Sequence, residues 1–517
     1  MDEGRKKERR SLGSRFLGAV ERAGNRLPHP ITLFVLLSLA VVVISALCQA
    51  LGVSAAGELV SGGALAETRV EAVSLLTREG LAWMLTSAVT NFTGYVPLGT
   101  VLVAMLGVGI AEESGLISAA LRRAVQAAPR RLITPVIVFL GVMSNVATDA
   151  GYVVLIPLGA LVFRACGRHP LAGLAAAFAG VSGGFSANLI VGALDPMFAG
   201  ITQAAAQMVD PDYQVSAACN WYFLIASTFL ITILGTVITD KVVEPRLGAW
   251  EERGEEGLPD ALGNRERRAL RRAGLTALLF VLTVALLCLP KDSFLRNENG
   301  QLVGSPASPL LDGVIVLIAL LFFLPGVVYG RAAGTLRGER AVCEALGRTM
   351  ASMGSYVALA FVAAQFIEYF SYTRLGTILA IRGADFFRSA GVGLIPLMLL
   401  FVLFSAFLNL FMGSASAKWN ILAPVFVPMF MLLDYTPELA QLAYRIGDSC
   451  TNIITPLMSY YAVIVSYARR YDRKAGIGTL TATMLPYSLC FLVFWSLLLV
   501  AWLLLGWPIG PGAGIRL

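Results

Sequence analysis

The stretch GSASAKWNILAP, residues 413–424, places a lysine, a tryptophan, an asparagine and two serines between two strongly apolar segments. The segment before it reads GLIPLMLLFVLFSAFLNLFM, and the segment after it reads VFVPMFMLL. These polar residues lie where a membrane protein should be most apolar. Their meaning therefore depends on what the rest of the chain is.

The composition of the 517-residue chain is that of a polytopic helical membrane protein. It is 57% hydrophobic and only 14% charged, with a mean hydropathy of +0.73, and it holds more apolar runs than one soluble core could bury. Its basic residues lie in short clusters beside apolar runs, which favours membrane orientation over nucleic-acid binding. The seven cysteines are scattered without a CxxC pair and there are two histidines, so we expect neither a disulfide framework nor a zinc site.

Apolar runs long enough to cross a bilayer recur along the chain. A span needs about 20 helical residues. Two further long segments, 169–205 and 437–465, carry polar interruptions. The full-length candidates are residues 31–51, 96–110, 221–239, 273–289, 310–328, 350–370 and 480–505.

The distribution of lysine and arginine predicts the orientation of the chain. With the N-terminus in the cytoplasm and the C-terminus outside, most of the 40 Lys and Arg residues are cytoplasmic, as the positive-inside rule requires. The basic clusters lie at residues 5–26, 122–131, 241–272, 331–348 and 469–474.

Two segments differ from ordinary spans, because each consists of two apolar halves that are too short to cross the membrane. Residues 133–163 read ITPVIVFLGVMSNVATDAGYVVLIPLGALVF between Arg131 and Arg164, both assigned to the cytoplasm. Each apolar half has about 12–14 residues, or roughly 20 Å of helix, which does not cross the membrane. We therefore predict a re-entrant helical hairpin with NVATDAG at its tip. Residues 393–433 predict a second hairpin that enters from the opposite side.

The two hairpins resemble each other in sequence. Aligned without gaps, residues 152–180 lie over residues 419–447 and share prolines and a glycine at fixed separations, and a broken helix follows each hairpin. The identities are Leu155/Leu422, Pro157/Pro424, Phe163/Phe430, Pro170/Pro437, Ala176/Ala443 and Gly180/Gly447.

The fold prediction is an all-α membrane protein with about nine transmembrane helices and two re-entrant hairpins in an inverted repeat, divided into scaffold and core subdomains. Its parts, by residue number, are a basic cytoplasmic segment, 1–30; a first half, 31–240, with hairpin 132–164 and broken helix 169–205; a charged cytoplasmic linker, 241–272; and a second half, 273–517, with hairpin 393–433 and broken helix 437–467.

Four breaks in an inverted repeat are the sequence sign of a secondary transporter, with its site near the midplane. Polar residues gather at these breaks, and clusters of Asn, Ser, Thr and Asp suit Na⁺ better than a transition metal. They are Asn145, Thr148 and Asp149; Ser182, Ser186, Asn188 and Asp195; Asn409, Ser414, Ser416, Trp419 and Asn420; and Arg445, Asp448, Ser449, Thr451 and Asn452.

Each of these residues also has a purely structural interpretation. Arg445 and Asp448 are three apart on one helical face and could form a structural ion pair. Lys418 could snorkel, hold the hairpin tip or contact a ligand. Trp419 could simply pack, and Asp149 and Asp195 could cap half-helices.

Several long motifs of this chain resemble one known family. FLNLFMGSASAKWNILAPVFVPMFMLL, TPELAQLAYRIGDSCTNIITPLMSYY and SNVATDAGYVVLIPLGALVF look like the signature regions of the aminobenzoyl-glutamate transporter (AbgT) family. The resemblance implies a homodimer in the bacterial inner membrane, with nine transmembrane helices and two re-entrant hairpins per subunit. It further implies uptake of p-aminobenzoyl-glutamate or export of sulfonamide antimetabolites, coupled to Na⁺ or H⁺.

The resemblance also carries over site residues. Positions that match the family's substrate site are Asp195, Ser416, Trp419, Pro437, Arg445, Asp448 and Pro456. Its ion site points to Asn409 and Asp448, to which the repeat adds Asn188 and Asn452.

The chemistry of these residues suggests their roles. We expect Trp419 to stack on the aminobenzoyl ring and Arg445 to bind a substrate carboxylate through its fork of donors. Asp448, with Asn409, would hold Na⁺ or carry a proton. Breaks at Pro437 and Pro456 would let the core move.

Three rival functions remain open at the level of sequence. A dicarboxylate or citrate transporter shares paired hairpins but has less need of a large aromatic residue at the tip. An intramembrane lipid-modifying enzyme would need a catalytic or metal motif such as HExxH, which the chain lacks. A passive channel is the third. The direction of transport and the coupling ion are not encoded in residue type.

Overall fold

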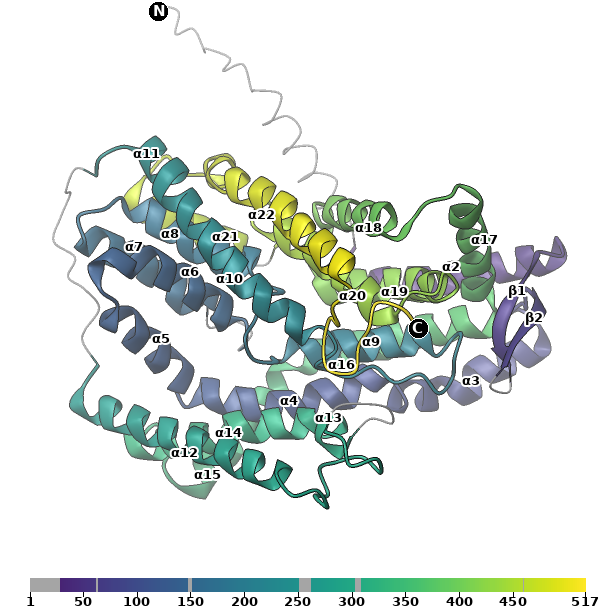
Figure 1. Ribbon diagram of the computed structural model, residues 1–517, viewed down its shortest axis with the longest axis horizontal. Coiled ribbons are helices and arrows are strands. Elements are labelled where there is room, and N and C mark those ends of the chain that lie inside the picture. The colour runs from purple at the N-terminus through teal and green to yellow at the C-terminus, as the bar shows by residue number, and fades with distance from the viewer. Residues whose placement is uncertain (1–27, 62–63, 147–150, 251–261, 303–307, 459) are drawn as a thin grey trace, which may run out of the picture.

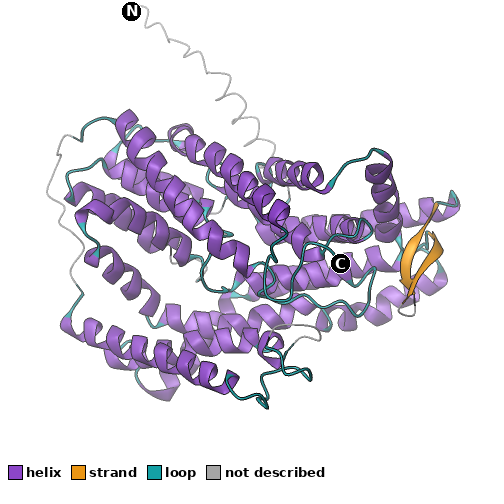
Figure 2. Ribbon diagram, viewed as in Figure 1, coloured by secondary structure: helices purple, strands orange, loops and turns teal. Residues whose placement is uncertain are grey.

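The computed structural model describes residues 28–61, 64–146, 151–250, 262–302, 308–458 and 460–517. Most of this part of the chain is helical, and the helical membrane architecture predicted above is confirmed (Figure 2). Six helices are long and apolar enough to cross a membrane, and two bent helix pairs could raise that number to eight in the described ranges. The predicted count of nine stays a prediction.

The first half of the chain runs from residue 30 to residue 247 (Figure 1). A two-stranded antiparallel hairpin, in which Ser54 pairs with Glu71, follows its first helix. The elements are α2 Pro30–Ala50, β1 Ser54–Ser61, β2 Ala64–Glu71, α3 Arg78–Thr93, α4 Val96–Glu113, α5 Leu116–Ala127, the 3₁₀ turn η1 Arg130–Leu132, α6 Ile133–Ser144, the π-helical turn η2 Gly151–Leu155, α7 Ile156–Ala165, α8 Pro170–Phe178, the π-helical turn η3 Ala179–Gly183, α9 Leu194–Ala206, α10 Trp221–Ile238, the π-helical turn η4 Thr239–Val243 and α11 Glu244–Leu247.

The second half is helical throughout its described residues. Its elements are α12 Asn264–Cys288, α13 Pro309–Asp312, α14 Val314–Ala333, α15 Gly338–Ser352, α16 Gly354–Tyr372, α17 Leu375–Ser389, α18 Leu394–Asn409, α19 Ala415–Met431, α20 Pro437–Asn452, α21 Tyr461–Tyr471 and α22 Ile477–Leu505.

Two features of the sequence prediction need correction. The chain is not strictly all-α, because β1 and β2 form a hairpin at one end of the molecule (Figure 1). The hydropathy pattern also missed the helices α3, α5, α15 and α17, which carry polar residues and lack the uniform apolar run of a span. In particular, α3 and α4 together form one 36-residue membrane-span candidate, so the short predicted span at 96–110 is the second part of a longer helical segment.

Proline and small residues set where the broken helices begin and pack. Both α8 and α20 start with proline, Pro170 and Pro437, at a position where the missing N–H costs no hydrogen bond. A Cβ at Gly180 would lie 2.3 Å from the Val138 carbonyl oxygen, and one at Gly447 would lie 2.3 Å from that of Val402. Each glycine therefore lets its broken helix touch the first helix of its own hairpin region, which is the packing that an internal repeat predicts.

The helices form groups around these breaks. α12 and α14 pack together with α4, while α15 also contacts α4, and this group follows one long side of the molecule (Figure 1). α2, α3 and α16 form a second group. α9, α19 and α20 pack against one another and bring the two halves of the chain into contact. Residues 147–150 of the first hairpin tip, with the predicted Thr148 and Asp149, lie outside the described residues.

Candidate functional site

The candidate site lies where α9 of the first half meets α19 and α20 of the second half. α20 begins at Pro437 and is buried along its whole length, although it carries Arg445 and Asp448. Charges inside a membrane protein are costly unless they are paired or hydrated. The site is therefore defined by how these two charges are partnered.

Arg445 pairs with Asp195 across the two halves of the chain. The Arg445 Nη2 and Asp195 Oδ1 atoms are 2.7 Å apart, and each side chain is 4% exposed. The second Asp195 oxygen accepts a 2.7 Å hydrogen bond from the Gly192 N–H, so the carboxylate also fixes the loop that leads into α9. The guanidinium lies over the Phe198 ring, 5.2 Å from its centroid. The structural alternative in which Arg445 pairs with Asp448 is thus wrong.

Asp448 pairs instead with Lys418. Lys418 Nζ is 2.5 Å from Asp448 Oδ1, and the two side chains are 1% and 0% exposed. The same ammonium donates to Asn409 Oδ1. The Tyr444 hydroxyl and the Asn452 amide also reach the carboxylate, at 3.3 and 3.4 Å. Lys418 therefore neither snorkels to the surface nor stands alone.

Three of the four residues predicted to bind Na⁺ do come together. The Asn409 amide nitrogen donates to the Asp448 carbonyl oxygen at 2.6 Å and to Asn452 Oδ1 at 2.8 Å. Asn188 belongs to a different place, the loop before α9 beside Gly192, and among the described residues it shares no hydrogen bond with this cluster. The arrangement does not fit Na⁺ as it stands, because Lys418 already contacts the two oxygens, from Asp448 and Asn409, that would face the ion.

Trp419 is fully buried in the same layer. Its ring stacks on Tyr444 with centroids 4.6 Å apart and an interplanar angle of 20°. Its indole N–H donates to Thr202 Oγ1 at 2.9 Å, and Thr202 in turn donates to Gln441 at 2.6 Å. The predicted stacking face is therefore occupied by Tyr444, and Trp419 lines neither of the cavities described below.

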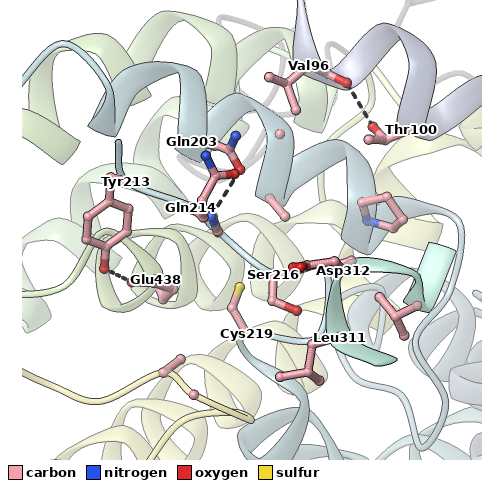
Figure 3. Close-up of a pocket in the computed structure, with 18 of the residues that line it drawn as sticks. Val96, Thr100, Gln203, Tyr213, Gln214, Ser216, Cys219, Leu311, Asp312 and Glu438 are labelled. Carbon is pink, nitrogen blue, oxygen red and sulfur yellow. Dashed lines mark hydrogen bonds between the residues drawn. The ribbon is translucent and has the colours of Figure 1, made fainter. Parts of the chain in front are cut away.

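A cavity of about 680 Å³, here called the outer cavity, lies beside one end of this layer. It carries four acidic side chains and no basic one among its lining residues: Asp210, Asp212, Asp312 and Glu438. Figure 3 shows Tyr213 and Glu438 facing each other, and the Tyr213 hydroxyl donates to Glu438 Oε2 at 3.0 Å. Burial and the neighbouring Glu438 charge raise the pKa of Tyr213, so this phenol stays protonated and keeps the hydrogen that it donates to Glu438.

The outer cavity is connected to Trp419 by hydrogen bonds. The Asn220 amide donates through Nδ2 to the Glu438 carbonyl oxygen at 2.9 Å, and its Oδ1 accepts from Gln441 Nε2 at 2.8 Å. Gln441 accepts from Thr202, which accepts from Trp419. Cys219, which lines the cavity, accepts a 3.5 Å hydrogen bond from Gln441 Nε2. The polar layer therefore lies directly behind the cavity wall.

A second cavity of about 660 Å³, here called the tip cavity, lies at the tip of the second hairpin. Tyr152 and Tyr460 stack at its wall, with centroids 4.5 Å apart and an interplanar angle of 7°. Ser416 is the predicted substrate residue that lines it, at the N-terminus of α19, and Ser414 caps that helix. Both aromatic residues were missed as site residues, although the alignment of Tyr152 with Trp419 pointed to the first of them.

The two predicted prolines lie at opposite ends of the second broken helix. Pro437 is buried at the first position of α20. Pro456 is half-buried in the loop between α20 and α21, next to Leu457, which lines the tip cavity. The predicted substrate residues thus divide into a buried layer of four, Asp195, Trp419, Arg445 and Asp448, and three at its edges, Ser416, Pro437 and Pro456.

Comparison with known proteins identifies the family of this chain. The model of the AbgT transporter family matches residues 15–517. The chain belongs to the AbgT family. It is 39% identical over 507 residues to the p-aminobenzoyl-glutamate transport protein of Escherichia coli (strain K12), covering 98% of each chain.

Two solved AbgT-family structures have the same fold. The Alcanivorax borkumensis YdaH transporter is 48% identical, with a TM-score of 0.88 over 94% of this chain and 100% of its own. Neisseria gonorrhoeae MtrF, described as illuminating a class of antimetabolite efflux pumps, is 47% identical, with a TM-score of 0.89 over 96% of this chain and 100% of its own. These names describe transporters rather than enzymes, so neither the lipid-modifying enzyme nor the dicarboxylate transporter is favoured.

Proposed function

We propose that this chain is an ion-coupled secondary transporter of p-aminobenzoyl-glutamate or related folate catabolites, with export of sulfonamide antimetabolites as a second activity. The observation that carries the proposal is the closed polar layer beside two cavities. α9 contributes Leu194 and Met197 to the tip cavity and Pro196 and Gln203 to the outer cavity. Alternating access requires a site that a closed layer separates from each side in turn.

The tip cavity has the chemistry of a site for an aromatic carboxylate. Its volume falls within the roughly 300–1,000 Å³ typical of small-molecule sites. Tyr152 and Tyr460 offer ring faces to an aminobenzoyl group, and the α19 N-terminus around Ser416 offers a positive dipole end to a carboxylate. The acidic outer cavity is much less suited to hold an anion.

The buried layer supplies the contacts that become available as it opens. Arg445 Nε is buried without a hydrogen-bond partner among the described residues, so this guanidinium has a donor left for a substrate carboxylate beyond its pair with Asp195. Trp419 would meet the substrate ring only after it separates from Tyr444. In this proposal Asp195, Trp419, Arg445 and Asp448 contact substrate in the opened layer, and Ser416, Pro437 and Pro456 act at its edges.

In this proposal Asp448 and Asn409 couple substrate transport to the movement of an ion, either Na⁺ or H⁺. A negative side chain whose partner can change is the element that links ion and substrate through one set of charges. We further propose that the protein is a homodimer in the bacterial inner membrane, with its N-terminus in the cytoplasm. Native mass spectrometry from detergent would test the dimer directly.

Transport in proteoliposomes tests the function. The purified protein would be reconstituted with either an imposed Na⁺ gradient or an imposed pH gradient, and accumulation of labelled p-aminobenzoyl-glutamate and of a labelled sulfonamide would be followed. We expect accumulation against a concentration gradient that collapses when the driving ion gradient is dissipated. Equilibration without accumulation would identify a passive channel, and preference for succinate would identify a dicarboxylate transporter. Arg445→Gln is the loss-of-function variant, and Arg374→Gln, on an exposed loop before α17, is the matched control.

A further inference from the structure

The second hairpin carries a cation of its own. Lys418 lies in the first turns of α19, and its side chain reaches Asn409 at the end of α18 and Asp448 in the middle of α20. All three side chains are almost completely buried. A buried ammonium group is stable only with anionic or carbonyl partners, and here it has one of each.

The hydrogen bonds around Asn409 decide which of its atoms faces the cation. Its Nδ2 donates to the Asp448 carbonyl oxygen, Thr451 Oγ1 and Asn452 Oδ1, at 2.6 to 2.9 Å. An amide nitrogen can only donate, so the amide oxygen must be the atom that points at Lys418. The Asn452 oxygen is used in the same set of bonds. Within the cluster of Asn409, Asp448 and Asn452, the side-chain oxygens that face a cation are Asp448 Oδ1 and Asn409 Oδ1, and Lys418 contacts both.

The ion pair exists in one half of the described chain. Lys418 and Asp448 lie one residue beyond the two ends of the aligned stretch, and the residues opposite them in the first half, Gly151 and Val181, carry no charge. The amide does have a counterpart, because Asn145 stands at the end of α6. The Lys418–Asp448 pair is therefore a feature of the second half beyond what the repeated scaffold needs.

We propose that the Lys418 ammonium is the resident cation of the Asp448 site, in the place where a metal cation would otherwise be expected. The ammonium links the hairpin tip to α20, and the Asp448 site therefore holds no Na⁺ in this conformation. Only the consequence for ion coupling rests on the proposed function. If an ion acts at Asp448 during transport, it must do so in a state in which Lys418 has moved away from the carboxylate.

Thermal unfolding of the purified full-length protein tests the proposal without substrate or transport. Midpoints would be measured in NaCl, KCl and choline chloride at equal ionic strength for the wild type, Lys418→Met, Lys418→Met/Asp448→Asn and Lys291→Met. Methionine keeps an unbranched chain but removes the charge, and Lys291 is an exposed loop lysine that serves as the matched control.

The expected pattern is specific to one variant. The wild type and Lys291→Met should unfold at the same temperature in all three salts. Lys418→Met should unfold earlier in choline and recover by several degrees, with saturation, in Na⁺, because Na⁺ can then neutralise Asp448, which has lost its partner. The double variant should lose that Na⁺ response, since no carboxylate remains. Absence of a Na⁺ response in folded Lys418→Met would overturn the proposal.

A second measurement covers the case in which Lys418→Met does not fold. Equilibrium binding of radioactive Na⁺ would be compared between the wild type and Asp448→Asn. Equal binding by the two proteins supports Lys418 as the resident cation. Loss of a bound Na⁺ in Asp448→Asn would show that Na⁺ occupies the site despite Lys418, and would refute the proposal. Neither result depends on the transport assay, so the two proposals can fail separately.

Discussion

At the scale of the residue, the centre of this protein is made of buried charges whose partners come from different helices. Arg445 and Asp448 are three positions apart on α20, yet each pairs with a residue from another element, Asp195 on α9 and Lys418 on α19. Because one face of α20 carries a positive and a negative charge, it can form ion pairs with α9 and α19 at the same time. When either ion pair separates, a charged side chain becomes available to bind a substrate or an ion.

The Arg445–Asp195 pair should be strongly coupled in stability. We expect Arg445→Gln or Asp195→Asn alone to destabilise the protein by about 3–5 kcal/mol, because each leaves an unpaired buried charge. The double variant Arg445→Gln/Asp195→Asn should lose clearly less than the sum of the two. Unfolding midpoints in detergent, combined in a double-mutant cycle, measure this coupling. Additive effects would mean that the two side chains act independently.

Trp419 should respond to substitution as a packing residue in the resting protein. Trp419→Phe keeps a ring against Tyr444 but loses the hydrogen bond to Thr202, so we expect a loss of about 1 kcal/mol. Trp419→Ala should cost about 3–5 kcal/mol because it leaves a large cavity. Trp507→Phe, at a half-exposed tryptophan, is the control for unfolding measurements. A Trp419→Ala protein of normal stability would show that the ring does not hold the closed layer.

At the scale of the element, the broken helices depend on close approach to the first helix of each hairpin region. The Gly447 position leaves no room for a methyl group, since the Val402 carbonyl oxygen would lie 2.3 Å from it. The helix α18 packs along α20 at this point, and α6 packs on η3 in the same way near Gly180. Small residues at such contacts let helices in membranes pack through their backbones.

Replacement of Gly447 should therefore be harmful, whereas replacement of a helical glycine without close neighbours should not be. We expect Gly447→Ala to lower the unfolding temperature and to reduce transport, because α18 and α20 must move apart. Gly347→Ala in α15 is the matched control, since a Cβ there meets no atom within 4 Å. The control should be neutral or more stable by about 0.5–1 kcal/mol, as alanine favours helix. Equal effects of the two substitutions would contradict the packing argument.

At the scale of the whole molecule, the layer made by α9, α19 and α20 lies beside two cavities of similar volume, about 680 and 660 Å³. The predicted orientation assigns the outer cavity to the periplasmic side, because it lies at the start of α10, whose other end carries the basic linker. Transport would then consist of opening the layer to one cavity while it stays closed to the other.

Cysteine labelling should reveal this arrangement. Gln214→Cys lies on the exposed wall of the outer cavity, and Ser416→Cys lies in the tip cavity. In oriented vesicles we expect a membrane-impermeant thiol reagent to label Gln214→Cys from the periplasmic side alone. Ser416→Cys should be labelled from the cytoplasmic side and be protected by p-aminobenzoyl-glutamate. The unmodified chain, with its seven cysteines, gives the background. Labelling of both variants from the same side would refute the proposed arrangement.

The sequence by itself determined the class of the protein, and it led to the residues of the candidate site. Apolar length, basic clusters and the proline and glycine positions are local properties, so the helical membrane fold and the predicted spans could be derived without contacts. The same local evidence led to residues 409–452 as the centre of interest. It missed α3, α5, α15 and α17, whose polar faces are covered or exposed only according to what packs on them.

Only the tertiary structure decided which charge meets which. The spacing of Arg445 and Asp448 allowed a pair within one helix, and the structure pairs each of them with a different helix instead. It also placed Trp419 against Tyr444, and it brought Lys418 to the oxygens expected to hold Na⁺. The physical reason is that the energy of a buried charge depends on its distance to its neighbours, and those distances exist only after α9, α19 and α20 have packed together.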